Sequence, residues 1–240
     1  MDGRQRNLST AAAVAPFPLE TESQVIWSYD GDRRCELVSG RKINDELFND
    51  ILKVRHQTDD RWPDQRTPVD EYSDHYCMYV DGQPVGSLGV TRALDGDVYL
   101  HEYCPPPLVD EFHDSLVSAY RFRILHDFRR SSQLVPDIAL SRHMVREAWR
   151  EQISKGANLD LINIEKTHVP LYQRMGYVVC DGYDYLDPIL GTPSCLMFLP
   201  VDPDRPSFIR DIIMETDVRL PVARVLRALT RSRVSVNSSR

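Results

Sequence analysis

The chain has 240 residues and a mass of 27.7 kDa, which fits one large domain or two small ones. Hydrophobic residues make up 42% of it and charged residues 27%, and no run of about 18 apolar residues occurs, so neither disorder nor a membrane span is expected. Thirty-six acidic residues against 29 basic ones give a net charge of −7, which opposes binding to the phosphates of nucleic acids. The composition predicts a soluble globular protein with no nucleic-acid or membrane partner.

The five cysteines are scattered and show none of the spacings of cysteine or histidine metal ligands. We therefore expect reduced thiols, no metal and a cytoplasmic location. The apolar stretch at residues 11–15 is too short for the core of a signal peptide, and Pro16 and Pro18 interrupt it. Residues 1–24 are small and polar without a sustained period, so they predict a flexible leader before a domain at 25–204.

The first half of this domain contains one clear hairpin. A short strand at 35–38 precedes an amphipathic helix that Asn44 can cap and that runs to about residue 58. Acidic residues and prolines at 59–74 predict a surface loop. Asp81-Gly82 joins strands at 75–80 and 84–90, and this dipeptide is typical of a tight antiparallel turn. Another strand is expected at 98–103, before three prolines at 105–107.

The second half contains crossover helices. A helical stretch at 108–115 and a strand at 116–125 lead into a charged loop at 126–133. A long helix then begins near Pro136 and ends at Lys155-Gly156. A strand at 159–164, a short helix from Pro170 to Met175, and strands at 177–180 and 195–201 complete the domain, before an Arg-rich helical extension at 205–240. This order predicts a single α/β domain whose central sheet is mixed, mostly antiparallel and flanked by helices.

Two segments resemble the GCN5-related N-acetyltransferase superfamily, known as GNAT. Residues 124–134, Ile-Leu-His-Asp-Phe-Arg-Arg-Ser-Ser-Gln-Leu, are similar to the donor-binding motif, in which a strand ends in an aromatic-Arg pair, here Phe128-Arg129, before a turn and a helix. Backbone N–H groups at a helix N-terminus bind phosphate in such motifs, and glycines let the phosphate approach. Ser132 and Leu134 occupy the positions at which the family has glycine or another small residue. Residues 171–177, Leu-Tyr-Gln-Arg-Met-Gly-Tyr, resemble the family's Tyr-x-x-x-Gly-Phe segment.

A third set of residues resembles the acyl-homoserine-lactone and N-acyl-amino-acid synthase branch of this superfamily. It comprises residues 54–57, Trp62, residues 70–72 and residues 118–122, although Gly89 stands where the branch usually has an arginine. The branch takes acyl groups from carrier proteins as well as from CoA. The resemblance spans residues 35–200.

The resemblance implies roles for particular residues. Tyr172 would protonate the leaving thiolate, and its alternative role is that of a core aromatic residue. Glu102 is the candidate base for the amine, with His101, His126 and Glu165 as alternatives. The residues expected to contact the donor are Arg121, Phe122, Arg123, Arg129, Arg130, Ser131 and Ser132, and those expected to line the acceptor side are Arg55, Trp62 and Asp70. Pairing of Arg55 or Arg121 with Asp70 in a purely structural role is an equal alternative.

The implied activity is N-acyl transfer from a phosphopantetheine thioester to an amine of a small molecule, in specialised metabolism such as antibiotic biosynthesis. Because Ser132 and Leu134 crowd the phosphate turn, an acyl or peptidyl carrier protein is the expected donor and partner. The expected co-substrate is thus acyl-phosphopantetheine on a carrier protein or, alternatively, acyl-CoA, with no tightly bound cofactor. A non-catalytic module that binds acyl-pantetheine or a carrier protein is the alternative from another class.

Overall fold

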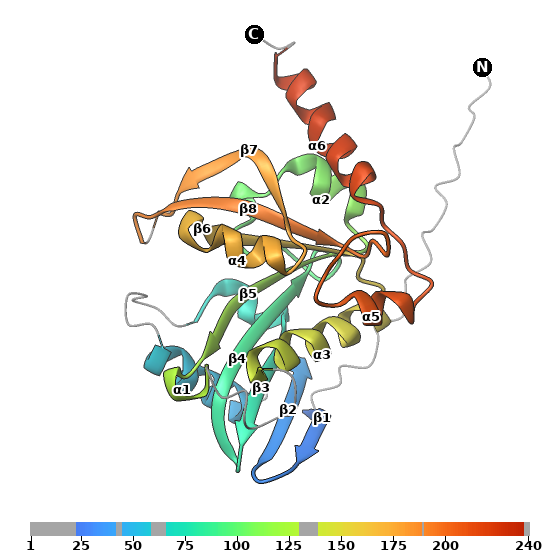
Figure 1. Ribbon diagram of the computed structural model, residues 1–240. Helices are drawn as coiled ribbons and strands as arrows, with labels where there is room; N and C mark the ends of the chain where they lie inside the picture. Colours follow the sequence, from blue (N-terminus) through green and yellow to red (C-terminus); the bar gives the residue numbers. More distant parts are fainter. Residues whose placement is uncertain (1–22, 42–44, 59–65, 130–138, 189, 238–240) are drawn as a thin grey trace, which may run out of the picture.

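The computed structural model describes residues 23–41, 45–58, 66–129, 139–188 and 190–237. Within them, eight strands form one sheet in the order β1-β2-β3-β4-β5-β6-β8-β7 (Figure 1). Neighbouring strands are antiparallel except β5 and β6, which are parallel. The strands are β1 (Gln24–Asp30), β2 (Arg34–Arg41), β3 (Asp74–Val80), β4 (Gln83–Arg92), β5 (Leu116–Ile124), β6 (Leu159–Glu165), β7 (Val178–Leu186) and β8 (Pro193–Pro200).

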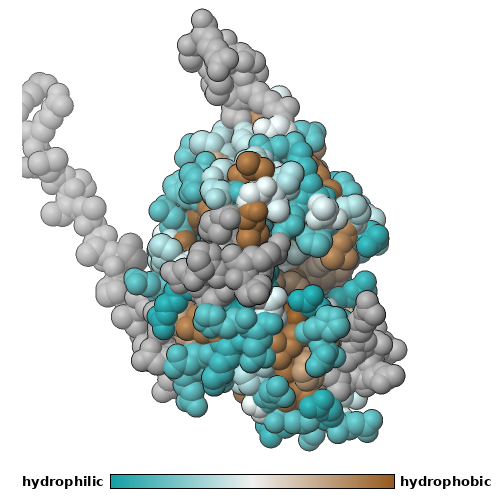
Figure 2. All heavy atoms as spheres, turned by 90° about the vertical axis from the view of Figure 1, so that its left-hand side faces the viewer, coloured by the Kyte–Doolittle hydropathy of each residue, from teal (hydrophilic) through white to brown (hydrophobic). Residues whose placement is uncertain are grey.

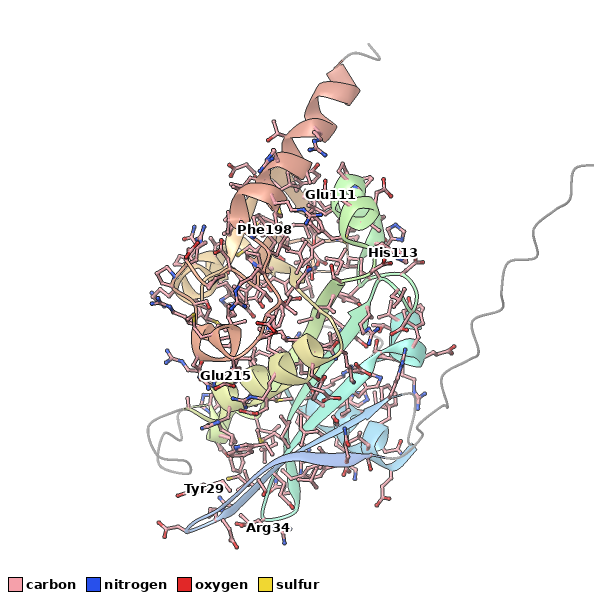
Figure 3. The ribbon with its side chains drawn as sticks, turned by 90° about the vertical axis from the view of Figure 1, so that its right-hand side faces the viewer. Tyr29, Arg34, Glu111, His113, Phe198 and Glu215 are labelled. Carbon is pink, nitrogen blue, oxygen red and sulfur yellow. The ribbon has the colours of Figure 1, made fainter. Side chains whose placement is uncertain are left out.

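Helices cover both faces of this sheet. The α-helices are α1 (Asp45–Thr58), α2 (Pro106–Phe112), α3 (Leu140–Ser154), α4 (Val169–Arg174), α5 (Arg210–Met214) and α6 (Val222–Asn237), and the 3-10 helices are η1 (Pro68–Tyr72), η2 (His101–Tyr103), η3 (His126–Phe128) and η4 (Lys166–His168). The apolar residues of α3, α4 and α5 pack on one face, and those of α1, α2 and α6 pack on the other. Phe198, which is fully buried, lies in the interior beneath α2 and α6 (Figure 3).

Most of the elements expected from the sequence are present. The Asp81-Gly82 turn joins β3 to β4, and both residues have positive φ, at 51° and 78°. This geometry is that of the tight hairpin turn which the dipeptide predicts. The long helix ends at Ser154, and the short helix α4 follows β6 with proline in its first turn. The predicted α/β fold, with a mixed and mostly antiparallel sheet, is confirmed.

Three expectations need correction. Residues 98–103 form no strand, because Leu100 turns the chain with a φ of 54° and η2 follows. A strand that the sequence analysis missed, β1, starts at Gln24, where a leader was expected to end; residues 1–22 lie outside the described residues. The segment expected to be a surface loop buries Asp70 and Ser73 through η1, and residues 59–65 are not described.

The C-terminal segment contributes to the packing on both faces of the sheet. Ile209, Ile212 and Ile213 join the core under α3, whereas Leu220 and Val225 join the core under α2. The chain therefore crosses from one face to the other between α5 and α6, and the far end of α6 projects beyond the rest of the domain (Figure 1). Among the described residues no helix is both long and apolar enough to cross a membrane. All five cysteines are buried and free, and burial raises the pKa of each thiol.

Candidate active site

The two parallel strands in the middle of the sheet separate soon after they meet. β5 and β6 pair only at Leu116 with Leu159 and at Val117 with Asp160. Beyond this point β5 follows β4 and β6 follows β8, so a gap that we call the fork opens toward their carboxyl ends. Figure 2 views the face toward which the fork opens, and there apolar side chains reach the surface between polar ones.

A bulge in β5 accompanies the fork. Tyr120 pairs with Gly89 and Arg123 pairs with Ser87, so two residues of β5 lie opposite one residue of β4. Arg121, the first residue of the bulge, has a φ of 52°, which is uncommon for a residue with a side chain. The bulge turns the second half of β5 away from β6. Strained backbone of this kind is concentrated at functional sites.

Asp160 of β6 lies at the base of the fork. Its Oδ1 accepts the Ala119 N–H of β5 at 3.0 Å, and its Oδ2 accepts the Tyr177 hydroxyl at 2.5 Å. The carboxyl is fully buried, and this burial raises its pKa to about 6, although the hydrogen bonds from Tyr177 and Ala119 oppose the rise. A small pocket between α3 and the sheet ends at this carboxyl, with Trp149 and Gln152 among its walls.

Tyr172 of α4 lies beside the fork, on the face of the sheet that α3 covers. Its ring meets the Tyr177 ring edge-on, with 5.4 Å between the ring centroids. Burial raises the pKa of Tyr172, while nearby Arg123 of β5 lowers it and Asp160 of β6 raises it further. The phenol is therefore close to charged groups on both strands and stays protonated at neutral pH. The structure thus places Tyr172 at the fork, and its role as an acid remains a prediction.

A cluster of four tyrosines occupies the other face of the fork, and the sequence analysis did not identify it. Tyr99 stacks on Tyr120 with 4.8 Å between centroids, and Tyr103 stacks on Tyr185 at 4.1 Å. The Tyr185 hydroxyl accepts the Asn163 amide N–H at 2.7 Å. The signal available in the sequence was the presence of tyrosines at positions 99 and 103 and at 183 and 185, but only the fold brings these two segments together.

Two of the arginines expected to contact the donor lie beside this tyrosine cluster. Burial raises the pKa of Tyr99, whereas the Arg121 guanidinium, which donates a hydrogen bond to its hydroxyl, and Arg123 lower it. Arg123 is thus near both Tyr99 and Tyr172, on opposite faces of the fork. Asp187 of the segment after β7 adds a negative charge near Tyr99. The site thus contains the Tyr172 phenol, the guanidinium groups of Arg121 and Arg123, and the stacked rings of the tyrosine cluster.

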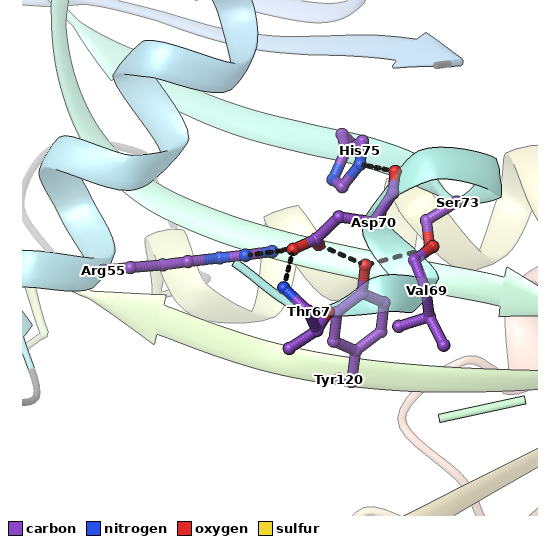
Figure 4. Close-up of polar contacts among 7 residues, drawn as sticks. All are labelled: Arg55, Thr67, Val69, Asp70, Ser73, His75 and Tyr120. Carbon is purple, nitrogen blue, oxygen red and sulfur yellow. Dashed lines mark hydrogen bonds and ion pairs between the residues drawn. The ribbon is translucent and has the colours of Figure 1, made fainter. Parts of the chain in front are cut away.

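Arg55 and Asp70 form a buried ion pair (Figure 4). Arg55 Nη1 and Nη2 donate to the two carboxylate oxygens at 3.1 and 3.0 Å, and the side chains are 1% and 3% exposed. The carboxylate also accepts the Tyr120 hydroxyl at 2.6 Å and the Thr67 N–H at 2.7 Å. Burial alone would raise the pKa of Asp70, but Arg55 and these hydrogen bonds hold it below its usual value. Of the two alternatives for Arg55, the structure shows the structural pairing with Asp70. The side chains of Arg55 and Asp70 are too buried to bind an acceptor.

Gly89 makes this network possible. A Cβ at Gly89 would lie 2.4 Å from the Tyr120 ring, so the ring rests directly on the backbone of β4. Where the resembling branch has an arginine, this chain has space for a tyrosine that donates to Asp70. The Tyr120 hydroxyl thereby joins the polar network of Figure 4.

Three of the four candidate bases lie in exposed positions. Glu102 is exposed on η2, and the strand that was expected to direct it toward the sheet is absent. His101 pairs with Asp97 at 2.7 Å, and His126 is 85% exposed. Glu165 is at the end of β6 and half-buried. Glu102 on a sheet strand was thus a wrong expectation, caused by the turn at Leu100.

The donor segment is described only in part. Phe122 and Phe128 pack against the core under α3, and Arg129 Nε donates to the Ile124 carbonyl at 2.9 Å. This bond closes the turn after β5 and leaves Arg129 largely exposed. Arg130, Ser131 and Ser132, like Trp62 on the acceptor side, lie outside the described residues.

Several solved structures have a similar architecture. The structure superimposes on the AHL synthase LasI with a TM-score of 0.53 and 12% identity, over 80% of this chain and 100% of that one. It superimposes on an acyl-CoA N-acyltransferase from Pseudomonas aeruginosa with a TM-score of 0.52 and 14% identity, over 68% and 98% of the two chains. A third match, FeeM, an N-acyl amino acid synthase from uncultured soil microbes, has a TM-score of 0.47, 10% identity and coverage of 69% and 90%.

No family model matches the sequence, and no curated protein matches it. At these identities the structural matches establish the fold. They confirm the GNAT fold expected from residues 124–134 and 171–177. The chain is a single α/β domain with this fold.

Proposed function

We propose that the protein is an N-acyltransferase that moves an acyl group from a phosphopantetheine thioester to an amine of a small molecule. The observation that carries the proposal is the fork between β5 and β6, with Tyr172 beside it. An extended arm with amide groups, such as pantetheine, can pair with a strand edge that has lost its neighbour. The second half of β5 offers such an edge. The structural neighbours, whose names describe N-acyl transfer, support the same activity.

The chemistry follows from the groups at the fork. The neutral amine nitrogen attacks the thioester carbonyl, the C–N bond forms, and the collapse of the intermediate breaks the C–S bond. The nitrogen releases one proton to water, and this proton balances the one that the departing sulfur takes from Tyr172, which water then restores. Tyr172 donates its proton to the departing thiolate, whose pKa of about 8.5 lies below that of a tyrosine, so the transfer accompanies bond cleavage rather than preceding it. Backbone N–H groups of β5 stabilise the oxyanion. The tyrosine cluster forms the wall on which the acceptor rests.

The donor is carried by a carrier protein in this proposal. Phosphopantetheine on a carrier presents one phosphodiester, which needs fewer N–H contacts than the pyrophosphate of CoA. Arg129 and Arg130 can meet that phosphate and the acidic residues of a carrier around it. A specialised-metabolite pathway is the setting that fits such a donor. An acyl-CoA donor is the alternative, and the acyl-CoA N-acyltransferase among the structural neighbours favours it.

Single-turnover transfer tests the activity and the donor together. The same acyl group is supplied on a carrier protein and on CoA with a mixture of amines, and intact mass and product mass are followed. We expect a higher kcat/KM with the carrier, decreasing as salt is added. Equal or better use of acyl-CoA would replace the carrier by CoA. Binding of the carrier without transfer of its acyl group would contradict the enzyme and favour a non-catalytic binding module.

Tyr172→Phe tests the proton donor. The ring still packs against Tyr177, so the variant should fold normally but transfer about 10²-fold more slowly, as for the loss of a general acid. Tyr29→Phe is the matched control, because Tyr29 lies near the end of β1 (Figure 3), at the opposite edge of the sheet from β7, on which α4 packs. An unchanged rate in folded Tyr172→Phe would exclude Tyr172 from the mechanism.

A further inference from the structure

Three strands meet at one carboxyl group. Asp160 belongs to β6, accepts the Ala119 N–H of β5, and accepts the hydroxyl of Tyr177, the residue before β7. Ala119 is two residues beyond Val117, which is the last residue of β5 to pair with β6 and pairs with Asp160 itself. At the point where the two strands separate, the Asp160 carboxyl thus accepts a β5 backbone N–H in place of a backbone carbonyl of β6.

We propose that Asp160 is a positioning residue for Tyr172, acting through Tyr177. This inference rests on the proposed acyl transfer, for which it names a further residue. The Asp160 carboxylate holds the Tyr177 phenol, and the Tyr177 ring supports the Tyr172 ring edge-on. By also holding β5, the carboxylate fixes the strand edge and the phenol relative to each other.

A carboxylate at this place is unfavourable for stability alone. It is fully buried in the pocket under α3, whose other walls are almost all apolar. Burial of a charge without an opposite charge destabilises a protein, and an apolar residue of similar size is often better tolerated. The raised pKa of the group reflects this penalty. Buried carboxyls with shifted pKa values are concentrated at functional sites, which fits a role in the reaction.

The charged groups that act on Tyr172 are Arg123 of β5 and Asp160 of β6. Tyr177 faces Asp160 from the start of β7 and Tyr172 from α4, while α3 contributes the neutral side chains of Trp149 and Gln152. The Trp149 indole also donates to the Tyr177 hydroxyl, so this phenol is held by two partners. A substitution of Asp160 should therefore change the position of the Tyr172 ring, by moving Tyr177, and the charge near its phenol.

Two substitutions at the contact and one control test the proposal. Asp160→Asn keeps an oxygen for the Ala119 N–H but offers an N–H to the Tyr177 hydroxyl, and Tyr177→Phe keeps the ring but removes the phenol. The control is Asp202→Asn, because Asp202 is also buried and its carboxylate accepts the backbone N–H of Val222 at the start of α6 and that of Asp204. Each variant is assayed over a range of donor and amine concentrations that reaches saturation, and its ¹³C-tyrosine spectrum is recorded.

We expect kcat to decrease about tenfold in Asp160→Asn and in Tyr177→Phe with little change in KM, because misplacement of a reacting group slows the step itself. The double variant should be no slower than the slower single variant, since both act through one contact. The Tyr172 ring resonance should shift in Asp160→Asn and stay in place in Asp202→Asn. Unchanged kcat and an unchanged Tyr172 resonance in folded Asp160→Asn would overturn the positioning role.

The spectra separate this proposal from the proposed function. A wild-type protein that transfers no acyl group from any donor would refute the function, and the Tyr172 resonance would still report whether Asp160 positions the ring. Loss of activity in Asp160→Asn without any shift of that resonance would also overturn the proposal, because the effect would then bypass Tyr172.

Discussion

Replacing Arg55 by methionine decides between a structural and a substrate-binding role for this arginine. Methionine keeps much of the aliphatic stem but leaves the Asp70 carboxylate in the interior without its cation. Loss of one partner of a buried ion pair destabilises a protein by about 3–5 kcal/mol. In a chain of this length one kcal/mol corresponds to about 2–4 °C, so the melting temperature should decrease by about 6–20 °C.

The assay is thermal unfolding followed by circular dichroism, with acyl transfer measured well below the transition. Arg55→Met combined with Asp70→Asn should be less destabilised than Arg55→Met alone, because the asparagine leaves no unpaired charge and still accepts from Tyr120. KM for the amine should stay unchanged in each folded variant. A wild-type melting temperature together with a many-fold higher KM would refute the reasoning and restore Arg55 to the acceptor site.

Three further outcomes can be checked. Burial raises the pKa of Asp160 to about 6, above the value of about 3.9 in an unfolded chain, so the folded protein retains a proton that the unfolded chain has lost between these values. The contribution of Asp160 to the free energy of unfolding, measured with urea, should therefore decrease by up to about 3 kcal/mol from pH 4 to pH 6. Asp160→Asn should lack this decrease and be more stable than wild type at pH 8. Gly89→Ala should lower stability by about 1–3 kcal/mol in the same measurement, because its Cβ would displace the Tyr120 ring; equal stability would mean that the ring moves freely. Gly176→Ala should lower both stability and transfer rate, because the φ of 104° disfavours a side chain and the Cβ would meet Ser207; a normal rate would show that the end of α4 is not constrained.

Local signals were sufficient for much of the fold. The Asp81-Gly82 hairpin and the short helix between Pro170 and Gly176 each depend on backbone preferences that a few neighbouring residues express. The position of Tyr172 follows from the same helix. These features are predictable because the sequence that specifies them is contiguous.

The remainder of the site depends on contacts between distant segments. In the sequence Asp70 resembles a loop residue, and only the fold brings Arg55 and Tyr120 to its carboxylate. Asp160 resembles an ordinary strand residue, and only the fold brings Ala119 and Tyr177 to its carboxyl group. Neither the bulge at Arg121 nor the turn at Leu100 has a glycine to mark it, although both residues have positive φ. Nonlocal packing imposes these conformations, so local propensity could not reveal them.

The passage of the chain from α5 to α6 has a consequence for synthesis. Ile212 and Ile213 complete the packing under α3, and Val225 and Leu229 complete the packing under α2, so both cores need residues beyond position 208. A ribosome that has made only the eight strands holds a sheet with apolar surface open on both faces. Domains generally fold as units during synthesis, and exposed apolar surface in the interval favours aggregation. The nascent protein therefore reaches its folded state late, and chaperone dependence should be greatest just before residues 209–229 leave the exit tunnel.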